Sequence, residues 1–126
     1  RCLIEAPDVF HAAVSEAPVT DWDGYDTCYT ERYMGTPANN AEGYKIASVT
    51  ANVARLSGKL LVMHGLIDEN VHFRHTARLV SALIEAGKPF EILPVPEERH
   101  SSRKHANRVR EFETLAAFFR RSLGRP

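Results

Sequence analysis

Two segments of the sequence are rich in side chains that can bind metals or transfer protons. The stretch MHGLIDENVHFRH, 63–75, holds two acids, an asparagine and three histidines within thirteen positions, and PEERHSSR, 96–103, adds another histidine. Such groups serve as metal ligands, as the acid and base of a hydrolytic enzyme, or as the polar cap of a turn between a strand and a helix. The elements that flank the two segments help to decide between these three interpretations.

Each segment follows a run of residues that predicts a β-strand. KLLVMHG, 59–65, is continuously apolar and lies between Gly58 and Gly65, which is typical of a strand covered on both faces. PFEILPV, 89–95, predicts the next strand, and HAAVSEA, 11–17, predicts an earlier one.

Apolar residues at helical spacing predict a helix associated with each segment. The first begins after a cap at Asn70 and ends at Gly87, and the second runs from Lys104 to Leu123. Their apolar faces are Phe73, Ala77, Val80 and Ile84 in the first, and Val109, Phe112, Ala116, Phe119 and Leu123 in the second. Shorter helical pieces are expected at 2–6, in parts of 19–36, and at 40–47 and 48–55.

Alternating strands and helices with short connections predict an α/β fold with a parallel sheet. In such sheets, functional groups gather at the carboxyl ends of the strands, where Asp68 and His100 would lie. An aspartate there can fix the tautomer of an imidazole, whose other nitrogen then acts as a general base toward a serine. The order Asp68 then His100, 32 residues apart, fits α/β hydrolases, but no G-x-S-x-G motif occurs. The alternative is that Asp68 caps a helix and His100 is merely solvated.

A metal site is the rival interpretation of the first segment, with the possible ligands His64, Asp68, His72 and His75. Helical zinc sites place their histidines at i and i+4, whereas His72 and His75 are three apart. Both lie at the start of an amphipathic helix, where polar residues face water, and His64 is expected to be a hydrogen-bonded core residue. We therefore expect no metal and no other cofactor.

The composition describes an ordinary globular chain of 126 residues with 44% hydrophobic and 25% charged side chains. Sixteen basic and sixteen acidic residues give zero net charge, which argues against a nucleic-acid partner, and no apolar run approaches the ~20 residues of a membrane helix. Cys2 and Cys28 form no metal-type pair and fit a reducing compartment such as the cytoplasm. The opening RCLIEAPDVF is typical of the middle of a protein, so we expect a fragment.

Three motifs together resemble the prolyl oligopeptidase family of serine peptidases, in its dipeptidyl peptidase IV branch. They are VTDWDGYDTCYTERYMG at 19–35, HGLIDENVHF at 64–73 and ERH at 98–100. The resemblance implies that 1–126 is the C-terminal half of a catalytic α/β-hydrolase domain, incomplete by itself. It also implies release of N-terminal dipeptides that end in proline or alanine, through a Ser–Asp–His triad whose serine lies upstream. The 126-residue chain alone would then be inactive.

The resemblance also implies roles for individual residues. Asp68 and His100 match the triad acid and base. The wall of an apolar pocket for the proline ring is matched by Val19, Trp22, Tyr25, Tyr29 and Val71. Asn70 matches a polar residue that contacts a substrate carbonyl, while Phe73 and the final helix match surfaces used for homodimerisation.

Several observations leave other functions open. The family's serine-bearing elbow, G-W-S-Y-G-G, is absent, and Glu16 places a charge near the end of a strand expected to be buried. By spacing alone, the aromatic residues of the pocket would be core residues of a helix. A truncated non-catalytic protein, either a pseudoenzyme or a dimerisation module, is therefore an alternative. An acylaminoacyl peptidase or an esterase would use the same triad, although the aromatic pattern favours proline specificity.

Overall fold

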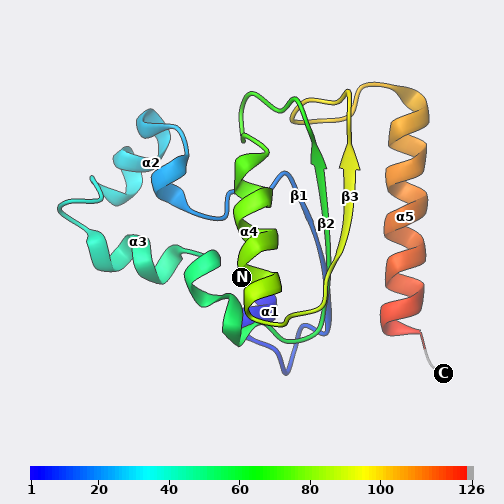
Figure 1. The fold of residues 1–126 in the computed structure, drawn as a ribbon, viewed down its shortest axis with the longest axis horizontal. Coiled ribbons are helices and arrows are strands. Elements are labelled where there is room, and N and C mark those ends of the chain that lie inside the picture. The colour runs from blue at the N-terminus through cyan, green and yellow to red at the C-terminus, as the bar shows by residue number, and fades with distance from the viewer. Residues whose placement is uncertain (125–126) are drawn as a thin grey trace.

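The computed structural model describes residues 1–124, in which helices flank a parallel sheet (Figure 1). The strands are β1 (Ala12–Glu16), β2 (Lys59–Gly65) and β3 (Glu91–Val95). The helices are α1 (Cys2–Glu5), α2 (Thr27–Met34), α3 (Ala41–Ala47), α4 (Arg74–Glu85) and α5 (His105–Leu123), with 3₁₀ turns η1 (Trp22–Gly24) and η2 (Thr50–Arg55). The predicted α/β order is confirmed.

The central strand, β2, pairs in parallel with β1 on one side and with β3 on the other. Its residues alternate between two cores: Leu60 and Val62 face one, and Leu61 and Met63 face the other. Because helices cover both faces, residues 60–63 of this strand are continuously apolar, as the sequence indicated. In the register of the sheet, Gly65 of β2 lies opposite Val95 of β3. The loops that follow these two strands therefore start at the same edge.

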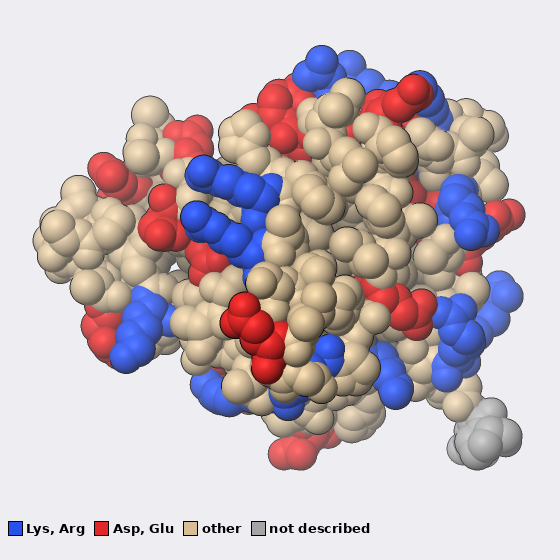
Figure 2. Space-filling view, viewed as in Figure 1, with Lys and Arg blue, Asp and Glu red and all other residues tan. Residues whose placement is uncertain are grey.

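The two faces of the sheet are covered by different helices. On one face, α1, η2 and α4 pack together, and α5 covers the other face (Figure 1). Basic and acidic side chains are interspersed over the face seen in Figure 2, without a large area of one sign. Among the described residues, no helix is both long enough and apolar enough to cross a membrane.

The apolar face predicted for α4 is wrong. The side chains that this helix buries are His75, Thr76, Leu79 and Leu83. Ile84, which the spacing placed inside, is 65% exposed. The helix carries two apolar stripes, and the prediction chose the one that ends at Ile84. Leu79 and Leu83 lie on the other stripe, beside His75 and Thr76, whose hydrogen-bonding partners are in the interior.

The predicted start of α4 is also wrong, whereas its end is confirmed. The helix begins at Arg74, after Phe73, and no side chain caps it, so Asn70 is not its cap. Gly87 follows the last turn with a φ of 63°, a conformation that glycine adopts without the strain of a Cβ atom.

The apolar face predicted for α5 is wrong in part. Phe118 is the residue that this helix buries against β2, together with the half-buried Phe119. Three residues of the predicted face are instead largely exposed, with exposed fractions of 41% for Val109, 65% for Phe112 and 56% for Leu123. The helix thus carries two apolar stripes, and the spacing alone could not indicate which one meets the sheet.

Candidate active site

A close backbone approach brings the two polar loops together. A Cβ atom on Gly65 would lie 2.3 Å from the carbonyl oxygen of Glu98 and 2.2 Å from that of Arg99. Only glycine fits there, because real Cβ atoms do not approach oxygen so closely. The backbone N–H of Ile67 also donates to the carbonyl of Glu98 at 3.2 Å. The loop after β3 is therefore held against the loop after β2.

Asp68 is the acid at the centre of this junction, and it is 4% exposed. Its Oδ1 accepts the backbone N–H groups of Asn70 at 2.9 Å and Val71 at 3.0 Å. Its Oδ2 accepts Nδ1–H of His100 at 2.9 Å. Burial raises the pKa of Asp68, but these hydrogen bonds outweigh it, so the pKa lies below its usual range and the carboxylate is ionised at neutral pH.

His100 is the imidazole of the pair, and it is much more accessible than its partner. The His100 side chain is 45% exposed, whereas that of Asp68 is 0% exposed. Because an ionised carboxylate can only accept, the bond from Nδ1 fixes the proton on that nitrogen. The other nitrogen, Nε2, has no hydrogen-bond partner in the part of the chain that the structure describes. The ring can therefore offer Nε2 as a base.

A second imidazole contacts the same carboxylate. His64, the penultimate residue of β2, lies with Nε2 3.2 Å from Oδ2 of Asp68 and 2.8 Å from the carbonyl oxygen of Val71. It is 1% exposed, as expected for a hydrogen-bonded core histidine. Its partner Asp68 could not be predicted from the residue pattern.

Glu98 is a further residue that the sequence did not single out. Although it lies two positions before His100, it is only 3% exposed. Its carboxylate accepts the backbone N–H groups of Arg103 at 2.9 Å and Lys104 at 3.0 Å, and the side-chain amide of Asn107 at 2.8 Å. These bonds, first among them that from Arg103, lower the pKa of Glu98. The carboxylate thus anchors the His100 loop to the start of α5.

The aromatic residues expected to form a pocket do lie together. Trp22 and Tyr29 stack at 6.0 Å with 18° between their planes, and Tyr25 meets both rings edge-on. The Tyr25 hydroxyl donates to Oδ1 of Asn70 at 3.1 Å, which links this group to the loop that carries Asp68. We call Trp22, Tyr25 and Tyr29 the aromatic group.

The two valines expected in the same pocket belong to the two segments that the bond between Tyr25 and Asn70 links. Val19 is half-buried and, with Trp22, lines a cavity of about 490 Å³ beside β1. Val71 is 3% exposed, and its backbone contributes to the site through the bonds to Asp68 and His64.

His75 attaches the aromatic group to α4, and the expectation that it faces water is wrong. It is 1% exposed; its Nε2 lies 3.1 Å from the carbonyl oxygen of Gly24, and its Nδ1 lies 3.4 Å from the backbone nitrogen of Thr20. Since a carbonyl only accepts and an N–H only donates, Nε2 carries the proton. Burial lowers the pKa of His75. His72, by contrast, is exposed as expected.

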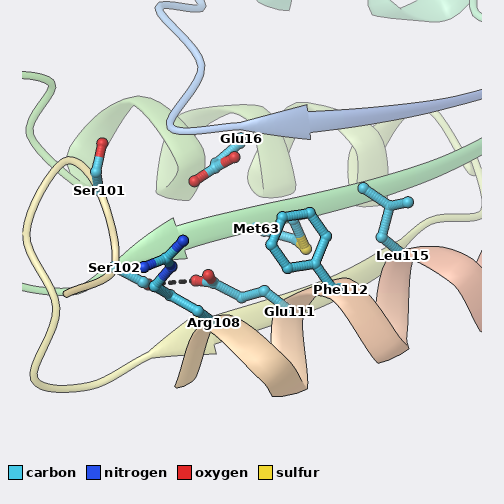
Figure 3. A pocket seen from close by; sticks show the side chains of 8 residues that line it. All are labelled: Glu16, Met63, Ser101, Ser102, Arg108, Glu111, Phe112 and Leu115. Atoms are coloured by element: carbon cyan, nitrogen blue, oxygen red, sulfur yellow. Dashed lines mark hydrogen bonds between the residues drawn. The ribbon is translucent and has the colours of Figure 1, made fainter. Parts of the chain in front are cut away.

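Glu16 does not place a charge in the interior. It is exposed at the end of β1, beside a pocket of about 210 Å³ that Arg108, Glu111 and Phe112 of α5 line from the other side (Figure 3). Neither the acid–imidazole pair nor the aromatic group lines this pocket. Within residues 1–124, no group of three or more His, Cys, Asp or Glu side chains is arranged to hold a metal ion.

The helices and the three-stranded parallel sheet have the fold of an α/β hydrolase. The crystal structure of dipeptidyl peptidase 4 from Porphyromonas gingivalis matches with a TM-score of 0.92 and 36% identity, over 95% of this chain and 17% of that one. A putative dipeptidyl aminopeptidase IV from Bacteroides ovatus matches with the same TM-score at 30% identity, over the same shares of the two chains.

Sequence comparison identifies the family. The model of the prolyl oligopeptidase family matches residues 1–126, and the chain belongs to this family. Dipeptidyl peptidase 8 of Homo sapiens is 48% identical over 104 residues, which cover 80% of this chain. Probable dipeptidyl-aminopeptidase B of Pyrenophora tritici-repentis is 43% identical over 109 residues, or 83% of this chain. The aligned region spans 12% of the length of each of these relatives.

Proposed function

We propose that this chain supplies the acid and the base of a serine-type dipeptidyl peptidase. The observation that carries the proposal is the 2.9 Å bond between Nδ1 of His100 and Oδ2 of a buried, ionised Asp68, with Nε2 left unbonded among the described residues. In this role Asp68 fixes the tautomer of His100. The Nε2 atom accepts the proton of a serine during attack on the peptide and returns it to the leaving amine.

The aromatic group is proposed to select the substrate. A proline ring is rigid and apolar, and a wall of tryptophan and tyrosine would bury it at about 25 cal/mol per Å² while excluding larger side chains. Val19 and Val71 would complete this wall, and Asn70 would contact a substrate carbonyl. Substrates would be peptides with proline or alanine in the second position. The proximity of Tyr25 to Asn70 supports the proposal, because it connects the pocket with the acid loop.

No motif of this sequence supplies the nucleophilic serine. The test therefore compares two proteins, the 126-residue chain and a longer product of the same gene. We expect the 126-residue chain alone to release no product from a Gly-Pro chromogenic substrate, because no acyl intermediate can form without a nucleophile. A longer product of the same gene, if it contains an elbow serine, should release it, and His100→Ala should abolish the release. The exposed His105 provides the control variant His105→Ala, which should keep full activity.

Three results would contradict parts of this proposal. Release by the 126-residue chain that is lost in His100→Ala would overturn the expected inactivity. Hydrolysis of acetyl-alanyl but not Gly-Pro substrates would indicate an acylaminoacyl peptidase or an esterase. Unchanged release in a longer product carrying His100→Ala would remove His100 from the chemistry.

A role in homodimerisation is a second candidate, supported by the exposed apolar stripe of α5. This stripe consists of Val109, Phe112 and Leu123. Phe73 is a weaker candidate for the interface because it is half-buried and packs edge-on against the ring of His64 at 5.4 Å. Sedimentation velocity should show a dimer that Phe112→Glu converts to monomer. A monomer in the unsubstituted chain would reject this role.

A further inference from the structure

His64 is a second histidine in contact with Asp68, the acid of the proposed triad. It precedes Asp68 in the sequence, whereas His100 follows it. His64 belongs to β2, the most deeply buried strand, and its side chain is 0% exposed. Its ring is fixed at three points: Nδ1 lies 2.7 Å from Oγ1 of Thr76, Nε2 lies 2.8 Å from the carbonyl oxygen of Val71, and the ring of Phe73 packs in an edge arrangement at 5.4 Å. The ring is therefore held rigidly where it meets Asp68.

The neighbours of Nε2 determine which nitrogen carries a proton. The carbonyl of Val71 and the ionised carboxylate of Asp68 are both acceptors, and they lie 2.8 Å and 3.2 Å from Nε2. A bare Nε2 would face two acceptors without a proton between them, which burial makes costly. The proton therefore lies on Nε2 and is shared between both oxygens. In the neutral ring, Nδ1 then accepts the hydroxyl of Thr76.

The resulting bonds hold Asp68 on both sides of its carboxylate. The backbone N–H of Val71 donates to Oδ1 of Asp68. The backbone carbonyl of Val71 accepts Nε2–H of His64, and the same N–H of His64 faces Oδ2 of Asp68. Rotation of the carboxylate would break bonds on both sides at once. We infer that His64 is a positioning residue that keeps Oδ2 of Asp68 directed toward His100. This inference rests on the proposed roles of Asp68 and His100.

The first test needs no substitution. In the 126-residue chain labelled with ¹⁵N, the chemical shifts and proton couplings of the imidazole nitrogens report which nitrogen is protonated. We expect His64 to be protonated at Nε2 and His100 at Nδ1, each set by the bond that it makes. A bare Nε2 in His64 would overturn the inference, because that nitrogen could not donate to Asp68.

The second test compares two substitutions of His64 whose side chains differ in length. The amide nitrogen of His64→Gln can occupy the place of Nε2, whereas the shorter His64→Asn reaches only the place of Nδ1. We expect His100 to keep its Nδ1–H tautomer in His64→Gln. In His64→Asn it should lose that tautomer and revert to Nε2–H, the form that a histidine side chain in water favours. The exposed His72 gives the control, since His72→Gln should change neither ring.

Three outcomes have a defined meaning. If folded His64→Asn leaves His100 protonated at Nδ1, His64 does not position Asp68. If neither variant folds, the tautomer of His64 in the unsubstituted chain still decides. Because these measurements need no peptide cleavage, a failed peptidase assay would reject the proposed function without affecting the contact between His64 and Asp68.

Discussion

The acid–imidazole pair and the aromatic group are neighbours that the fold holds in different ways. Around Asp68, every partner is buried or belongs to a loop anchored at both ends, and the carboxylate accepts four N–H groups. The aromatic group lies on a more exposed segment, with Tyr29 51% exposed. Its links to the rest of the site are a few bonds to residues about fifty positions away, such as that from His75 to Gly24.

The two parts of the site should therefore differ in how well they tolerate substitution. The pair depends on backbone geometry that a single Cβ atom can destroy. The aromatic group depends on side-chain bonds, each of modest strength, so that its loss should be gradual. Local stability should therefore be high at the pair and low at the aromatic group.

Gly65→Ala should have the largest effect. Its Cβ would lie within 2.3 Å of two backbone carbonyls, which cannot move without displacing the loop that carries His100. We expect the free energy of unfolding to fall by about 3 kcal/mol, at the upper end for forced packing in a core. Denaturant titration gives this value directly.

The matched control is Gly87→Ala. Gly87 has a φ of 63° but open space around its Cβ position, so the substitution should cost only the left-handed strain of about 1 kcal/mol. Equal losses at the two positions would mean that the approach of the two loops is not rigid.

Glu98→Gln should have the next largest effect. The amide cannot accept all three bonds that the carboxylate accepts, so the His100 loop loses part of its anchor to α5. We expect Tm to fall by roughly 5 °C, as for the loss of a helix cap. Because the pKa of Glu98 is lowered on folding, its contribution is complete above the usual carboxyl value of 4.5 and is lost as the pH falls through the lower folded value.

The neighbouring residue provides the comparison for Glu98. Glu97 is exposed, and within residues 1–124 its ion-pair partner is the side chain of Lys104. Glu97→Gln should leave Tm within about 1 °C of the unsubstituted chain, since exposed ion pairs contribute little. A similar fall in both variants would point to net charge rather than to the anchor.

The sequence predicted the order of elements well because the signals were local. A continuous apolar run between two glycines indicated β2, and its position placed Asp68 and His100 at adjacent strand ends. Their contact follows from the topology of a parallel sheet and did not depend on side-chain detail.

The partners of these residues could not be predicted in the same way. His64, His75 and Thr76 are polar and buried, and their partners lie in the tertiary structure. Hydrophobic periodicity places such residues outside, and with two apolar stripes on α4 it could not identify the one that Leu79 and Leu83 bury. The burial of Glu98 could not be predicted for the same reason. In the sequence it is one of several charged loop residues, and its partners are at the start of α5.

His75 should produce a smaller effect that depends on pH. Its pKa is lowered in the folded state, chiefly by burial, so the unfolded chain binds a proton more readily. The free energy of unfolding should therefore decrease as the pH falls below the ordinary value of 6.5, by up to about 1.4 kcal/mol per pH unit. In His75→Gln this part of the slope should disappear.

Trp22 can report where this change occurs, because it is the one tryptophan of the sequence. A proton on Nδ1 of His75 would face the backbone N–H of Thr20, so acid should loosen the aromatic group first. We expect Trp22 emission to change at a higher pH than global unfolding. His72→Gln should leave both curves unaltered, and a coincident change of emission and unfolding would contradict the separate stability of this region.

Tyr25→Phe should have the smallest effect on stability. It tests directly whether the aromatic group can change without changing the acid–imidazole pair. It removes only the hydroxyl that donates to Asn70, and because Asn70 is exposed, water can replace the bond. The free energy of unfolding should fall by about 0.5 kcal/mol. Acrylamide quenching of Trp22, whose ring centre lies 6.0 Å from that of Tyr25, should increase, whereas Tyr33→Phe at a 70% exposed position should leave it unchanged. The tautomer of His100 should remain Nδ1–H, since Asp68 keeps all of its donors. If His100 changes as well, the two regions form one network, and the bonds around Asp68 do not isolate it from the aromatic group.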